Sequence, residues 1–211
     1  MNLQIKAAVE IHQFFTKADI PYAIIGGIAL QHWGEPRFTR DVDVTILVDL
    51  GQEEATLKKI LSIFSPRISD ALEFALKHRV CLVQSREGIE IDISLGIPGY
   101  EQEVVKRAVE CDLGSGIVRI CSAEDLIIHK AVAGRPQDLL DIDGVIIRQG
   151  KRLNVAYIRR WLKEFSRLLE MEEILQRFEE AWRRFGKRGS VKNKYEKGSE
   201  NEKDNSIPNN S

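Results

Sequence analysis

The chain has 211 residues, of which 43% are hydrophobic and 30% are charged, and its formal net charge is -1 at pH 7. This composition is sufficient for a compact core, and the balanced charge excludes a broadly basic nucleic-acid-binding protein. Cys81, Cys111 and Cys121 form no CxxC pair and are odd in number, so neither a disulfide framework nor a zinc site is indicated. No apolar run approaches the roughly 20 residues of a membrane span, and the opening residues lack a signal-peptide pattern, so we expect a cytoplasmic protein without membrane contact.

The first part of the chain alternates helical and strand-like patterns. Residues 2–18 carry apolar side chains near helical spacing and predict an amphipathic helix. Strand-like runs then span residues 22–25, 41–48, 79–84, 89–95 and 116–121, and helix-like stretches span residues 27–33, 52–64, 70–77 and 100–110. Such an alternation predicts a mixed α/β (α+β) fold.

The rest of the chain is predicted to be helical and then disordered. Ser122, with an acid three residues later, and Asn154 are typical helix N-caps, so residues 122–185 are expected to form helices. From residue 186 to 211 the chain is rich in Lys, Asn, Ser, Glu and Gly, and it cannot bury enough apolar surface to fold alone. We therefore expect a core over 1–121, a helical part over 122–185 and a disordered tail over 186–211.

Two glycines, Gly26 and Gly27, follow the first strand-like run and precede a predicted helix. The backbone amides at a helix N-terminus are unpaired and lie at the positive end of its dipole, so they suit the oxygens of a polyphosphate. Glycine also lets a ligand approach the backbone closely. The turn therefore indicates a phosphate-binding site.

Asp41 and Asp43 occupy alternate positions of the strand-like segment Asp-Val-Asp-Val-Thr-Ile-Leu-Val, so both carboxylates share one face. Two carboxylates this close repel each other unless a cation compensates, and Mg²⁺ prefers such oxygen ligands together with substrate phosphates. The alternative is a solvated strand end with two acidic residues. The glycine turn upstream favours a metal-nucleotide site.

The pattern of Gly26-Gly27, thirteen further residues and then Asp41-Val42-Asp43 resembles the signature of the DNA polymerase β-type nucleotidyltransferase superfamily. Residues 32–40 are similar to the branch that contains the AbiEii-type nucleotidyltransferase toxins, and a weaker match continues to about residue 143. Gly27 stands where many members have Ser, and the spacing from glycine to aspartate is long. The resemblance implies a nucleotidyltransferase-type mixed sheet flanked by helices.

The resemblance also implies a third metal-binding carboxylate, which helps to deprotonate the attacking hydroxyl. Asp92 is the candidate, because it shares the polar face of the strand-like segment 89–95 with Glu90 and Ser94. Glu90 repeats the same spacing and remains a competing candidate. An ordinary half-exposed strand would show the same alternation.

A second block resembles the segment of the family in which a helical lysine reaches the triphosphate and an acid follows it. Lys130 matches the lysine, and Asp138 or Asp141 matches the acid. Arg135 would add a second cation, and Arg40, which flanks the aspartates, is assigned to nucleotide binding. On spacing alone, Lys130 would be an ordinary surface lysine.

These features lead us to expect transfer of a nucleoside monophosphate from a nucleoside triphosphate to an acceptor hydroxyl, with two Mg²⁺ ions that Mn²⁺ could replace. The resembling branch implies RNA, specifically tRNA, as the acceptor and an antitoxin protein as partner. A small-molecule acceptor such as an aminoglycoside is an alternative, as is a nucleotide-binding regulatory module without transfer activity. Arg159, Arg160 and Lys163 are candidates for an RNA-binding face, although a solvated helix surface explains them equally well.

Overall fold

The computed structural model describes residues 2–186, so the predicted tail from residue 187 onward lies outside the described residues. The helices are α1 (Leu3–Lys17), α2 (Gly26–Trp33), α3 (Glu53–Leu61), α4 (Ala71–His78), α5 (Tyr100–Lys106), α6 (Ala123–Ala133), α7 (Pro136–Gln149), α8 (Val155–Leu169) and α9 (Glu173–Phe185), with a short 3-10 helix, η1, at Gly150–Arg152. The strands are β1 (Tyr22–Ile24), β2 (Val42–Ile46), β3 (Ser65–Pro66), β4 (Val80–Gln84), β5 (Glu90–Leu95), β6 (Val109–Asp112) and β7 (Ile117–Ile120).

Within residues 2–186 the strands form one seven-stranded sheet in the order β3-β4-β5-β2-β1-β7-β6. The sheet is mixed, because β2 runs parallel to β5 and β1 runs parallel to β7, while the other neighbours are antiparallel. The predicted mixed α/β class is therefore confirmed. The register of the β2–β5 pair places Asp43 directly opposite Asp92.

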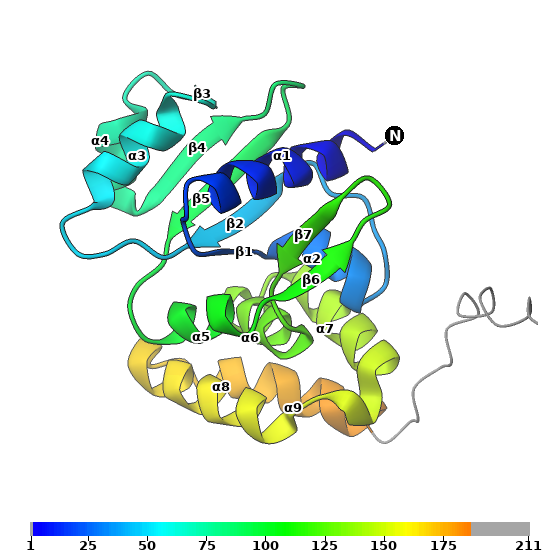
Figure 1. Ribbon diagram of the computed structural model, residues 1–211. Coiled ribbons are helices and arrows are strands. Elements are labelled where there is room, and N and C mark those ends of the chain that lie inside the picture. Colours follow the sequence, from blue (N-terminus) through cyan, green and yellow to red (C-terminus); the bar gives the residue numbers. More distant parts are fainter. Residues whose placement is uncertain (1, 187–211) are drawn as a thin grey trace, which may run out of the picture.

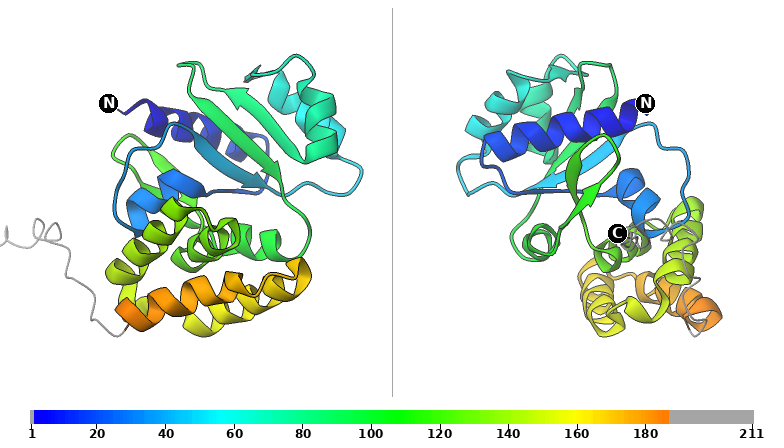
Figure 2. Two further views of the ribbon diagram at one scale, coloured as in Figure 1. Left: turned by 180° about the vertical axis from the view of Figure 1, so that it is seen from behind. Right: turned by 45° about the vertical axis from the view of Figure 1, so that its right-hand side comes forward.

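Helices cover the sheet and extend the molecule at one end (Figure 1). The first helix, α1, lies across the sheet and buries Ala7, Ala8, Ile11 and Phe15 on its inner side, as its apolar spacing predicts. The two views in Figure 2 place α8 and α9 at the end of the molecule farthest from α3 and α4. None of the helices in residues 2–186 combines the length and apolar character that a membrane crossing requires.

The predicted helical region from residue 122 is confirmed as far as Phe185, and its caps are those that the sequence indicates. Ser122 Oγ accepts a hydrogen bond from the backbone amide of Asp125 at 3.1 Å, which caps α6. The side chain of Asn154 likewise accepts from the backbone amide of Tyr157 at 3.0 Å and caps α8. These bonds satisfy amides that a helix start leaves without partners.

The predicted helix over residues 100–110 is too long. Helix α5 ends at Lys106, and residues Val109–Asp112 instead form the edge strand β6, which pairs antiparallel with β7. Only Cys111 of this strand is buried, so the segment has too little apolar alternation to be recognised as a strand. The two-residue strand β3 is not predicted from the sequence either, because both of its residues are exposed and show no apolar alternation.

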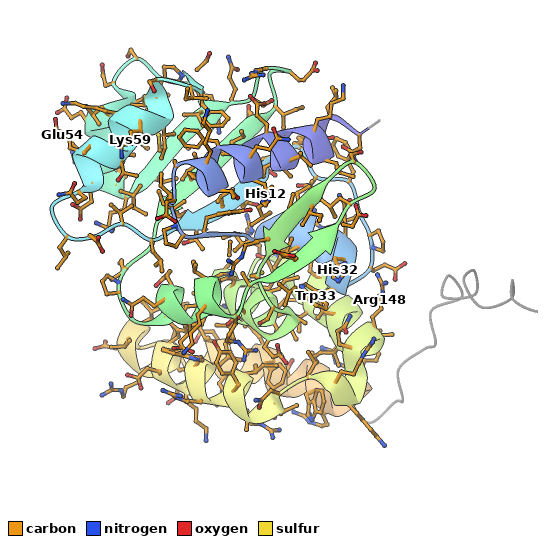
Figure 3. The ribbon with its side chains drawn as sticks, viewed as in Figure 1. His12, His32, Trp33, Glu54, Lys59 and Arg148 are labelled. Atoms are coloured by element: carbon orange, nitrogen blue, oxygen red, sulfur yellow. The ribbon has the colours of Figure 1, made fainter. Side chains whose placement is uncertain are left out.

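Hydrogen bonds join the end of α2 to the helical region. Trp33 Nε1 donates to the backbone oxygen of Cys121 at 2.7 Å, and the side chain of Gln149 donates to the backbone oxygen of Trp33 at 2.8 Å. Arg148 also donates to the backbone oxygen of Gly34. Figure 3 shows Trp33 and Arg148 near one another at this junction. Helix α7 is therefore attached directly to the element that carries the glycine turn.

Candidate active site

The glycine turn lies at the end of β1, where α2 begins. Gly26 has a φ of +59°, and a Cβ atom added there would lie 2.0 Å from Asp43 Oδ2. A Cβ added at Gly27 would lie 2.3 Å from Thr39 Oγ1. The backbone amide of Ile25 donates to the backbone oxygen of Asp43 at 2.9 Å, which ties the turn to β2. Both glycines are therefore required by close approach of the chain carrying the aspartates.

The structure brings Asp41, Asp43 and Asp92 to the same region of the sheet. Asp43 and Asp92 are opposite one another on neighbouring strands, and Asp41 precedes β2 by one residue. Burial, followed by the charges of Asp41 and Asp92, raises the pKa of Asp43 to about 6. Asp41 and Asp92 therefore lie close enough to oppose ionisation of Asp43.

Asp92 is ion-paired with Arg67, a residue that the sequence did not single out. Arg67 follows β3, its backbone amide donates to the backbone oxygen of Leu82 at 3.0 Å, and its guanidinium also lies 3.1 Å from Glu90 Oε2. The side chain of Arg67 thus reaches β5 across β4. No local pattern in the sequence reveals this pair, because the two residues are brought together only by the pairing of strands.

Lys130 is the centre of a buried ion-pair network between α6 and α7. Its Nζ lies 2.9 Å from Asp138 Oδ1 and 2.8 Å from Asp141 Oδ2, and its side chain is only 6% exposed. Arg37 makes two hydrogen bonds of 2.9 Å to Asp141, and Arg135 Nε lies 2.7 Å from Asp138 Oδ2. Burial opposes ionisation of both aspartates, but the hydrogen bonds from these cations outweigh it and lower the pKa of Asp138 and of Asp141.

A cavity of about 410 Å³ connects these parts. It is lined by the glycine turn, the loop before β2, the first two aspartates and the start of the helical region, namely Gly26, Gly27, Arg37, Phe38, Thr39, Arg40, Asp41, Asp43, Lys130, Arg135, Gln137 and Asp138. The structure thus brings the predicted glycines, Asp41, Asp43, Arg40 and Lys130 around one cavity, whereas neither Asp92 nor the alternative acid Asp141 is part of its lining. The lining also includes Phe38 and Thr39, which the sequence did not single out.

The carboxylates of this cavity are the residues that could hold a divalent cation. Among the described residues, no three His, Cys, Asp or Glu side chains are arranged to hold a metal ion together. Asp41 and Asp43 nevertheless fit Mg²⁺, which is commonly held by one or two carboxylates together with substrate phosphates. That Asp92 is a third ligand stays a prediction, and it requires Asp92 to release Arg67.

The candidate RNA-binding face on α8 has part of its charge already compensated. Arg159 Nε lies 2.6 Å from Glu179 Oε1 on α9. The guanidinium of Arg160 lies 5.2 Å from the ring centroid of Trp161, within the range of a cation–π contact. The face therefore contains the predicted basic residues, but Arg159 also has a structural partner.

Several solved structures resemble this chain at low sequence identity. The structure of an antigenic nucleotidyltransferase-like protein from Paracoccidioides brasiliensis is 18% identical, with a TM-score of 0.46, and covers 82% of this chain and 92% of that one. The lincomycin-bound lincosamide antibiotic adenylyltransferase LnuA is 14% identical, with a TM-score of 0.44, over 64% of this chain and 92% of that one. ANT(2")-Ia in complex with adenylyl-2"-tobramycin is 17% identical, with a TM-score of 0.47, over 87% of this chain and 99% of that one.

No curated protein sequence matches the chain. The family model described as "Nucleotidyl transferase AbiEii toxin, Type IV TA system" matches residues 17–190, which include the glycine turn, all three aspartates and the Lys130 network. The chain therefore belongs to the AbiEii nucleotidyltransferase toxin family.

Proposed function

We propose that this protein transfers a nucleoside monophosphate from a nucleoside triphosphate to an acceptor hydroxyl, in a reaction that depends on divalent metal ions and releases pyrophosphate. The observation that carries the proposal is the single cavity shared by Gly26, Gly27, Asp41, Asp43 and Arg135. It combines backbone amides for phosphate oxygens, carboxylates for metal ions and a cation for the leaving group. These are the requirements of phosphoryl-type transfer, where the protein supplies position and charge.

Asp41 and Asp43 would hold the metal, with Asp92 as a third ligand. Bound Mg²⁺ would neutralise phosphate charge and lower the pKa of the attacking hydroxyl. Mn²⁺ takes similar oxygen ligands and is expected to substitute.

The residues of the chain would divide the chemical work among them. Asp92 accepts the proton of the acceptor hydroxyl, which requires Arg67 to leave its carboxylate. The acceptor oxygen then bonds to the α-phosphorus, and the bond from the α-phosphorus to the bridging oxygen of the pyrophosphate breaks. Amides of the Gly26-Gly27 turn and the side chain of Arg135 stabilise the charge that develops on the leaving pyrophosphate.

Lys130 would position the phosphate-binding cation and would not contact a phosphate itself. Its ammonium is shared between Asp138 and Asp141, whereas the side chain of Arg135 is 72% exposed at the cavity. The exposed guanidinium of Arg135 is therefore the cation that reaches a phosphate most readily. Lys130 binds Asp138, and Asp138 in turn pairs with Arg135. Arg40, which also lines the cavity, would contribute a further positive charge.

For the acceptor, we propose tRNA, which would make the protein the toxin of a toxin–antitoxin pair that acts in the cytoplasm with a cognate antitoxin. The family description names a type IV toxin–antitoxin system, which supports this context. Arg159, Arg160 and Lys163 are the proposed contacts for the RNA backbone, because phosphates of an RNA chain need cations beyond those around the triphosphate.

The test is incubation of the purified protein with each of the four nucleoside triphosphates, labelled at the α-phosphate, and total RNA. We expect label on RNA of tRNA size, dependent on Mg²⁺ and abolished by a chelator. Asp43→Asn should abolish labelling, since an amide is a poorer metal ligand and carries no charge. Asp49→Asn, an exposed aspartate beyond the other end of β2, is the matched control and should label normally.

Each of the other possible outcomes would indicate a different function. Label on a small hydroxyl compound but not on RNA would contradict the tRNA acceptor. Triphosphate binding without transfer to any acceptor would instead indicate a regulatory module. Equal activity of Asp43→Asn and the unmodified protein would show that Asp43 is not a metal ligand.

A further inference from the structure

Phe38 is the aromatic side chain with the greatest exposure among the described residues. It is 73% exposed, and every other Phe, Tyr and Trp side chain in 2–186 is buried or half-buried. It lines the same cavity as the glycine turn and the two aspartates. Aromatic side chains that line a cavity together with a few polar groups are typical of small-molecule binding sites.

The exposure of Phe38 does not result from a loosely held loop. On one side, Arg37 makes two hydrogen bonds to the buried carboxylate of Asp141 and donates to the backbone oxygen of Phe38 at 3.3 Å. On the other side, Thr39 is only 7% exposed, and its Oγ1 donates to Asp41 Oδ1 at 3.0 Å. The contacts of its two neighbours therefore hold Phe38 in position beside the cavity that it lines.

The chemistry around Phe38 identifies the kind of ligand. The glycine turn of the same cavity suits a polyphosphate, and Arg40 and Arg135 add positive charge beside it. A ligand with phosphates at one end and a flat ring at the other would satisfy both features. Nucleobases stack on aromatic side chains with little dependence on sequence, because every base has a π face.

We infer that Phe38 is the stacking platform for the base of the bound nucleoside triphosphate. The inference rests on the proposed function, and it adds a residue that positions the substrate through its base. Because a phenyl face does not read the edge of a base, Phe38 should contribute similarly to the binding of all four triphosphates.

The test compares two ligands that differ by the nucleoside. Binding of ATP and of inorganic tripolyphosphate, each with Mg²⁺, is measured by titration calorimetry. In Phe38→Ala the Kd for ATP should rise by about 10-fold or more, as expected for loss of one stacking contact. The Kd for tripolyphosphate, which has no base, should not change. Phe38→Trp should restore ATP binding.

Leu50→Ala is the matched control, since Leu50 is 84% exposed and lines a separate cavity at the opposite end of β2. It should change neither Kd. Unchanged ATP binding in Phe38→Ala would overturn the inference, and so would an equal loss of tripolyphosphate binding, which would indicate a distorted loop. A raised KM for RNA with unchanged ATP binding would place an acceptor base there instead, and would also overturn it. If the unmodified protein bound none of the four triphosphates, ATP included, the proposed function itself would be overturned.

Discussion

Substitution of Gly26 by alanine is the most direct test of the site geometry. The added Cβ would lie 2.0 Å from Asp43 Oδ2, whereas ordinary contact begins near 3.4 Å. The carboxylate must therefore move by about 1.4 Å, and a displacement of 1 Å at a reacting centre lowers rates by about 100-fold. The positive φ adds a backbone penalty of about 1–2 kcal/mol for a residue with a Cβ. We expect Gly26→Ala to lose at least about 100-fold in turnover.

Gly51→Ala separates the two effects. Gly51 has a φ of +82°, but a Cβ added there would meet nothing within 4 Å. It should lose a similar free energy of unfolding, about 1–2 kcal/mol, and retain full activity. The assays are urea unfolding and transfer of α-labelled nucleotide at saturating Mg²⁺. If Gly26→Ala were as active as Gly51→Ala, close approach to Asp43 would not be the reason for glycine at position 26.

Three further predictions concern the helical region. Lys130→Met should lower the free energy of unfolding in urea by about 3 kcal/mol, because it removes a buried cation shared by two carboxylates; a loss below about 1 kcal/mol would refute this. Exchanging both Arg159 and Lys163 for Glu should weaken RNA labelling and flatten its salt dependence, with ATP binding unchanged; unaltered labelling would remove this face from RNA binding. Burial lowers the pKa of His129 to about 4, and its Nδ1 has no hydrogen-bond partner. The stability that a neutral His129 provides is therefore present above pH 6.5 and is lost as the pH falls toward 4. Between pH 7.5 and 5 this loss should reach about 2 kcal/mol in thermal or urea unfolding, and His129→Leu should lack that component.

The centre of the site was predictable because its signals are local. Gly26 and Gly27 lie at a strand end, and the alternation around Asp41 and Asp43 gives their shared face without knowledge of the rest of the fold. Asp92 required both the alternation of its own strand and the resemblance to a family. The register of β2 and β5 then places it opposite Asp43.

The remaining features depend on contacts between distant segments. Arg67 directly follows β3, and it reaches Asp92 on β5 because only β4 lies between these two strands in the sheet. Lys130 was identified, but its pairing with Asp138 and Asp141 follows from the way α7 folds back on α6. Phe38 carries no signal in the sequence, since an isolated aromatic residue in a loop is more often part of a core. Its exposure becomes visible only when its neighbours have been placed.

The cavity draws its residues from both sides of residue 121, and this has a consequence for the chain in the cell. A nonsense mutation or a proteolytic cut after residue 121 would leave the glycine turn and the aspartates intact. It would remove Lys130 and Arg135 and deprive Arg37 of its carboxylate partner, Asp141. The shortened product would thus lack the cations that we propose to contact the phosphates, so a truncation at that point should abolish the proposed transfer rather than leave a partly active fragment.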